Sequence, residues 1–146
     1  MERYLFDSST LIASFVQNHP KHPSAFLWFK RAKQGEIDFC VSAHSLLEVY
    51  SVLTSAPFKP RISPQGAWEL IDSNIKQSAH IISLSEHDYF KILNRVYQKG
   101  LAGGVIYDAI MVECAIKKQI GKILTSNSKD FVRLISGEDT IEIIGI

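Results

Sequence analysis

The chain has 146 residues, of which 46% are hydrophobic and 21% charged, so it has the size and composition of one globular domain over residues 1–146. Its formal net charge of +1 neither indicates nor excludes a nucleic-acid partner, because local patches decide such binding. The first residues lack the apolar core of a signal peptide, and no apolar run approaches the roughly 18 residues of a membrane span. We therefore expect a cytoplasmic protein that does not bind membranes.

Short apolar runs alternate with helical patterns along the chain. In order, they predict a strand over residues 4–6, a helix from 11–13, a helix over 23–35, a strand over 38–42, a helix over 43–55, a helix from 63–64, a strand over 80–84, a helix over 85–99, a helix over 105–120, and strands over 122–125 and 140–144. The first run is apolar throughout, which is typical of a central strand buried on both faces. Strands that alternate with helices predict an α/β domain with a parallel sheet.

Three acidic residues lie at the ends of these elements or outside the apolar stripes of the helices: Asp7, Glu48 and Asp108. Asp7 ends the first strand and is also a suitable N-cap for the helix that follows, and the cap and a ligand are compatible roles. Asp108 lies in the first turn of its helix, where the helix dipole favours the ionised form. Glu48, considered alone, has the position of a solvated residue on a helix face.

In a parallel sheet the carboxyl ends of the strands gather at one edge, so these three acids would lie on the same side of the domain. Carboxylates that cluster raise one another's pKa, and a divalent cation relieves their repulsion. Oxygen ligands suit Mg²⁺ or Mn²⁺, which keep several waters and accept a phosphate. Such an ion would activate water against a phosphodiester and stabilise the leaving oxygen.

A polar segment over residues 126–130 follows the fourth predicted strand and is closed by Phe131, which we expect to anchor in the core. We predict that this segment is a loop at the carboxyl end of a strand, where open α/β sheets hold their ligands. Asn127 is then either a turn residue or a ligand for metal-bound water or phosphate. Asp130 is either a cap or turn residue or an acid that supports the site.

Four motifs occur in order: Leu-Phe-Asp-Ser-Ser-Thr-Leu-Ile from residue 5, Ser-Leu-Leu-Glu-Val-Tyr from residue 45, Gly-Gly-Val-Ile-Tyr-Asp-Ala-Ile-Met-Val-Glu-Cys-Ala from residue 103, and Ile-Leu-Thr-Ser-Asn-Ser-Lys-Asp-Phe from residue 123. Together they resemble the motifs of PIN domains, above all the VapC-type toxin subunits of VapBC toxin–antitoxin pairs. The resemblance covers nearly the whole chain. It implies a PIN-like fold in which a parallel sheet of four or five strands lies between helices.

By this resemblance the protein would be a metal-dependent endoribonuclease, the toxin of a type II toxin–antitoxin pair. It would hydrolyse RNA with water, leaving a 5′-phosphate and a 3′-hydroxyl. Asp7 and Asp108 would ligate Mg²⁺ or Mn²⁺ directly, and Glu48 would do so directly or through water. Ser9 would support the site.

The resemblance also implies three kinds of partner: RNA, a second copy of the chain in a homodimer, and a small antitoxin peptide laid over the groove. Lys129 and Arg133 lie in or after the last polar segment, either as RNA contacts or as solvated charges.

Two aromatic residues, Trp68 and Phe90, are hard to bury together with the apolar stripes of the helices that carry them. Surplus aromatic residues of this kind mark interfaces, so we expect the helices that carry them to associate.

One position departs from the pattern of the family. Many members carry a fourth acid two residues after Thr125, where this chain has Asn127. This leaves a second hypothesis, a catalytically silent PIN-like module that only binds RNA or protein. The presence of all three acids weighs against it. A receiver-like or phosphatase-like domain would need further aspartates beside Asp7.

Overall fold

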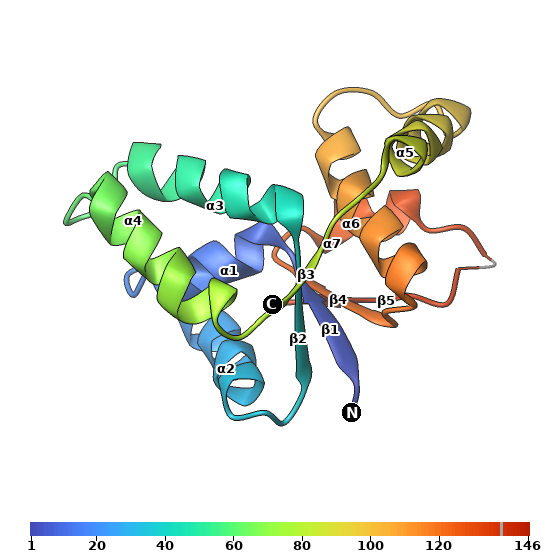
Figure 1. Ribbon diagram of the computed structural model, residues 1–146. Coiled ribbons are helices and arrows are strands. Elements are labelled where there is room, and N and C mark those ends of the chain that lie inside the picture. Colours follow the sequence, from blue (N-terminus) through green and yellow to red (C-terminus); the bar gives the residue numbers. More distant parts are fainter. Residues whose placement is uncertain (138) are drawn as a thin grey trace.

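The computed structural model describes residues 1–137 and 139–146 and contains one sheet with helices on both faces (Figure 1). Its strands are β1 (Arg3–Phe6), β2 (Asp38–Ser42), β3 (His80–Ile82), β4 (Lys122–Thr125) and β5 (Glu142–Gly145). They are ordered β3-β2-β1-β4-β5, and every neighbouring pair is parallel. The predicted α/β class with a parallel sheet is therefore confirmed, and the predicted central strand is β1.

The helices of the described residues are α1 (Ser8–Phe15), α2 (His22–Lys33), α3 (Ala43–Ser55), α4 (Pro64–Ile71), α5 (Glu86–Gln98), α6 (Val105–Lys118) and α7 (Ser128–Leu134). A π-helical turn over Asp72–Lys76 continues α4 directly. A capping box opens α5, where Ser85 and Asp88 each accept a hydrogen bond from the backbone N–H of the other. Among the described residues, none of the helices has the length and apolar character needed to cross a membrane.

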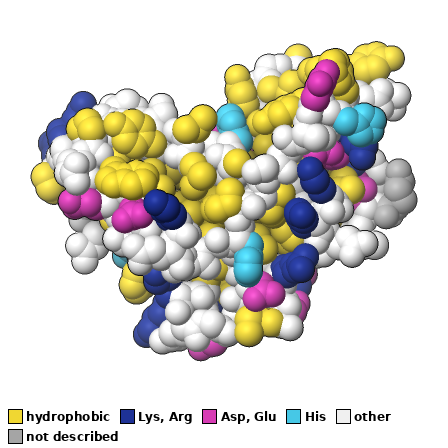
Figure 2. Space-filling view, in the orientation of Figure 1, with side chains coloured by type: hydrophobic (Ala, Val, Ile, Leu, Met, Phe, Trp, Pro, Cys, Tyr) yellow, Lys and Arg dark blue, Asp and Glu magenta, His cyan; other side chains and the backbone are white. Residues whose placement is uncertain are grey.

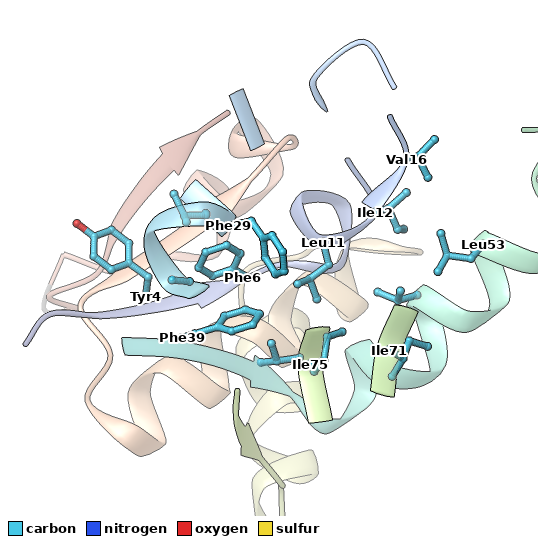
Figure 3. Close-up of a cluster of buried hydrophobic side chains, with 14 of the residues drawn as sticks. Tyr4, Phe6, Leu11, Ile12, Val16, Phe29, Phe39, Leu53, Ile71 and Ile75 are labelled. Carbon is cyan, nitrogen blue, oxygen red and sulfur yellow. The ribbon is translucent and has the colours of Figure 1, made fainter. Parts of the chain in front are cut away.

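Two hydrophobic cores cover the two faces of the sheet, because successive strand residues point to opposite faces. Tyr4 and Phe6 of β1 belong to the core beneath α1, α2, α3 and α4, while Leu5 belongs to the core beneath α5, α6 and α7. In the first core the rings of Phe6 and Phe39 meet edge to face with centroids 4.7 Å apart, and Phe29 packs on Phe39 at 5.9 Å (Figure 3). Because both hydrophobic cores are tightly packed against the sheet, the carboxyl ends of the paired strands β1 and β4 are held side by side.

The main difference from the prediction is a helix in the polar segment after β4. Residues 126–130 were expected to form a loop, but α7 begins within them, at Ser128. Phe131 is fully buried, as predicted, and Leu134 is buried one turn later on the same face. The helix is short and begins with polar residues, so only these two apolar positions mark its inner face. Such a pattern is too brief to reveal helical periodicity in the sequence.

Several element ends also differ from the prediction; for example, α1 begins at Ser8 rather than near Leu11, and β5 spans Glu142–Gly145 rather than 140–144. The helix α6 ends at Lys118 rather than at Ile120, because Gln119 adopts a left-handed conformation with a φ of 54° and closes the helix two residues earlier. The strand β3 ends at Ile82, although the predicted strand continued to residue 84. It ends there because its neighbour β2 ends at Ser42, the residue that pairs with Ile82.

Candidate active site

Asp7 lies at the carboxyl end of the central strand β1 and is almost fully buried, with 5% of its surface exposed. It is the N-cap of α1, and its Oδ1 accepts a hydrogen bond from the backbone N–H of Ser8 at 2.8 Å. Its Oδ2 accepts hydrogen bonds from the hydroxyls of Ser9 at 2.9 Å and Thr125 at 2.8 Å. Burial raises the pKa of Asp7, and the three hydrogen bonds partly oppose that rise. The carboxylate is therefore held rigidly at the edge of the sheet.

The hydroxyls of Ser9 and Thr125 also hold the chain that follows β4. Ser9 Oγ accepts a hydrogen bond from the backbone N–H of Ser126 at 3.1 Å, and Thr125 Oγ1 accepts one from that of Asn127 at 3.0 Å. Sequence reasoning treated Thr125 only as the end of a strand. A threonine that ends an apolar strand at the edge where acids gather was the signal that could have identified it.

Asp108 and the polar segment after β4 face each other. Asp108 is half-buried in the first turn of α6, and its Oδ2 lies 3.4 Å from Nδ2 of Asn127. The same amide nitrogen donates to Asp130 Oδ2 at 2.6 Å. Arg133 donates to the other oxygen of Asp130 at 2.7 Å. Asn127 is thus a neutral donor between two carboxylates, and it links Asp130 to Asp108.

Neighbouring acids act electrostatically on Asp108 and Asp7 at this edge. The pKa of Asp108 is raised to about 7, first by burial and then by the charges of Asp7, Asp130 and Glu48. Glu48 extends from α3, and its Oε2 lies 3.6 Å from Nε2 of His44. The charge of Glu48 also raises the pKa of Asp7. The three acids singled out from the sequence therefore lie close enough to influence one another across the fold.

Cationic side chains lie at the rim of the acid cluster. Arg133 is paired with Asp130, and Lys129 is exposed in the first turn of α7. Lys21, at the start of α2, reaches the same edge, where its Nζ donates to the backbone carbonyl of Ser126 at 3.3 Å. Lys21 lies 105 positions before Ser126 in the chain, so only the tertiary fold brings it here.

The acid cluster offers oxygen donors for a metal ion, but these donors do not form a preformed cage. Within residues 1–137 and 139–146, no three His, Cys, Asp or Glu side chains converge closely enough to form a ready-made metal site. Mg²⁺ does not need one, because it keeps several waters and binds through one or two carboxylates plus phosphate oxygens. The raised pKa values of Asp7 and Asp108 mark negative charge that the protein leaves uncompensated. The chemistry of these oxygen donors is therefore of the kind that Mg²⁺ or Mn²⁺ prefers.

Comparison with known proteins gives matches over nearly the whole chain. The family model of the PIN domain matches residues 4–135. Ribonuclease VapC27 from Mycobacterium tuberculosis is 26% identical over 140 residues, which cover 96% of this chain and 90% of the relative.

Solved structures share the fold at lower sequence identity. VapC20 from Mycobacterium tuberculosis, a toxin that cleaves the sarcin–ricin loop, superposes with a TM-score of 0.69 at 14% identity, covering 94% of this chain and 98% of that one. VapBC2 from Rickettsia felis, bound to a DNA fragment from its promoter, gives a TM-score of 0.66 at 20% identity and 98% coverage of both chains. With its acid-rich sheet edge, its parallel five-stranded sheet and this match over residues 4–135, the chain belongs to the PIN domain family and is distantly related to VapC ribonucleases.

Proposed function

We propose that this protein is a metal-dependent endoribonuclease, the toxin of a type II toxin–antitoxin pair, acting in the cytoplasm. The observation that carries the proposal is that the pKa values of Asp7 and Asp108 are both raised at the carboxyl edge of the sheet, first by burial and then by neighbouring acids that include Glu48. Uncompensated carboxylates in a cleft are costly for stability and typical of functional sites. The distant relationship to VapC ribonucleases supports phosphodiester hydrolysis as the chemistry.

Each side chain of the site has a distinct task in this proposal. Asp7 and Asp108 hold Mg²⁺ or Mn²⁺, and Glu48 does so directly or through water. When bound, the ion supplies an activated water and charge stabilisation at the phosphate. Ser9 and the hydroxyl of Thr125 keep Asp7 in one orientation through hydrogen bonds of 2.9 and 2.8 Å. A carboxylate held in this way does not need to reorganise during the reaction.

The polar segment after β4 orients the attacking water or the phosphate. Asn127 carries out this role, and Asp130 positions its amide through the 2.6 Å hydrogen bond. Lys129, Arg133 and Lys21 surround this segment and provide positive charge for the RNA backbone, which counters the repulsion between acids and phosphates.

Association with protein partners is also part of the proposal. Trp68 on α4 is 48% exposed and Phe90 on α5 is 61% exposed, so both rings lie largely outside the core. Figure 2 shows hydrophobic side chains gathered on the surface over α3 and α4 and again over α5. We propose that Trp68 and Phe90 belong to surfaces that bind a second copy of the chain or an antitoxin peptide. VapBC2 from Rickettsia felis, a toxin–antitoxin complex of the same fold, supports the antitoxin as a partner.

The decisive experiment is cleavage of a mixed-sequence RNA by the purified protein with Mg²⁺, with Mn²⁺ and with excess EDTA. Cleavage is expected only with a metal ion, and it should disappear in Asp7→Asn and Asp108→Asn while circular dichroism reports an intact fold. Equal cleavage in EDTA would remove the metal mechanism. An RNA that is bound but never cleaved would favour the second candidate, a silent RNA-binding module, for which the neutral Asn127 is the specific observation.

A further inference from the structure

An apolar cleft opens beside the acid cluster, and its lining residues come from α5, α6 and the start of α3. Figure 1 shows how these three helices are arranged. Its volume is about 380 Å³, which lies within the usual range of small-molecule sites. Its walls are mainly hydrophobic and aromatic, with Tyr89 and Leu93 from α5, Ile106 and Tyr107 from α6, and His44 from α3. Tyr89, Leu93 and Tyr107 are each at least half exposed, so large apolar surface remains open to a ligand.

Two of the lining rings form a stacked pair that touches the acid cluster. The planes of His44 and Tyr107 differ by 3°, and their centroids are 5.7 Å apart. His44 lies 3.6 Å from Glu48, and Tyr107 directly precedes Asp108 in the first turn of α6. Tyr107 remains 53% exposed despite the stacking, so ring surface is left for a second flat partner. Through His44, the aromatic pair is thus in contact with one of the proposed metal ligands, Glu48.

We infer that this cleft binds an unpaired base of the RNA, stacked against Tyr107, next to the phosphate that the acids engage. The inference rests on the proposed function, because it takes RNA as the substrate. Unpaired bases stack on aromatic side chains regardless of their identity, and single-stranded RNA is commonly recognised in this way. A nucleobase is a flat ring with apolar faces and polar edges, so it fits a cleft that has aromatic walls and the imidazole of His44 at its rim.

The position of the cleft favours a base over a permanent contact with a second copy of the chain. A second copy of the chain that filled the cleft permanently would lie against Glu48 and Asp108 and would hinder RNA from reaching them. A nucleotide would not block the acids, because its base can occupy the cleft while its phosphate lies at the acid cluster. The surfaces of Trp68 and Phe90 lie outside the lining of the cleft and remain available to protein partners.

The test uses oligoribonucleotides that carry one 2-aminopurine at successive positions, mixed with the full-length protein in EDTA. Stacking quenches 2-aminopurine, so one position should be quenched most strongly by the wild type. Tyr107→Ala should abolish this quenching and weaken binding by about 5- to 150-fold, the range for losing one stacked base. Tyr107→Phe should retain both. Tyr97→Ala is the matched control, because this tyrosine is 73% exposed on α5 outside the cleft and should bind as the wild type does.

An abasic site at the quenched position provides an independent check. It should weaken binding to the wild type as much as Tyr107→Ala does, with no further loss when both changes are combined. Unchanged affinity and quenching in a folded Tyr107→Ala protein would overturn the inference, as would an effect of this variant on sedimentation alone, which would make the cleft a protein interface. Because binding is measured without metal, RNA that stacks at Tyr107 but is never cleaved would contradict the ribonuclease activity and still support the cleft.

Discussion

Replacing Asp108 with asparagine is expected to stabilise the metal-free protein, increasingly so as the pH rises. The folded protein raises the pKa of Asp108 to about 7 from an ordinary value of 3.8. A carboxyl whose pKa is higher in the folded state stabilises the fold fully below its unfolded pKa, and this contribution is lost as the pH rises through the folded pKa. Asparagine has nearly the same shape but cannot ionise, so the variant Asp108→Asn avoids that loss.

The size of the effect follows from the raised pKa. One pKa unit corresponds to about 1.36 kcal/mol, so the wild type should lose up to about 3 kcal/mol between pH 5 and pH 8 through Asp108. This is an upper limit, because Asp108 is only half-buried and water screens part of the repulsion. For a chain of this size, the difference in melting temperature between Asp108→Asn and the wild type should grow by roughly 5–10 °C from pH 5 to pH 8.

The assay is thermal unfolding followed by circular dichroism at pH 5, 6.5 and 8, in EDTA. Asp88→Asn is the matched control, because Lys117 Nζ lies 2.7 Å from Asp88 and holds the pKa of that carboxyl well below its usual range. The stability that Asp88 contributes is present above its unfolded pKa and lost only as the pH falls, so this variant should be less stable at all three pH values. If Asp108→Asn unfolds at or below the wild-type temperature at pH 8, the reasoning about charge repulsion is wrong.

The remaining predictions concern other contacts of the fold. Asn127→Ala should lower RNA cleavage by up to ~10²–10³-fold with the fold intact, the scale for losing one orienting hydrogen bond, while Asn127→Asp should tighten Mn²⁺ binding in calorimetry and stay active. Ser45→Ala should lower the free energy of urea unfolding by about 1–3 kcal/mol, because it leaves the buried Ser8 hydroxyl without its acceptor at 2.9 Å. Phe90→Asp should weaken self-association in sedimentation velocity, and an unchanged sedimentation coefficient would place this ring outside the dimer interface.

The sequence by itself determined the kind and order of most elements, because the signals for them are local. The predicted bounds 38–42, 43–55 and 122–125 are those of β2, α3 and β4. The position of Asp7 at the carboxyl end of the central strand followed from the apolar run that it ends. Local signals were insufficient for α7, where two apolar residues in a short polar segment do not establish a helical period.

Only the tertiary structure decided which side chains meet at the site. Thr125 donates its hydroxyl to Asp7 across 118 positions of sequence, and Lys21 reaches the carbonyl of Ser126 across 105. Asn127 lies between two carboxylates only because α7 packs beside α6. These contacts depend on how helices and strands from distant parts of the chain fill the two cores. The local pattern of hydrophobic residues specifies that each element has a buried face, but the partner of a polar side chain at its end is set by the packing of the whole domain.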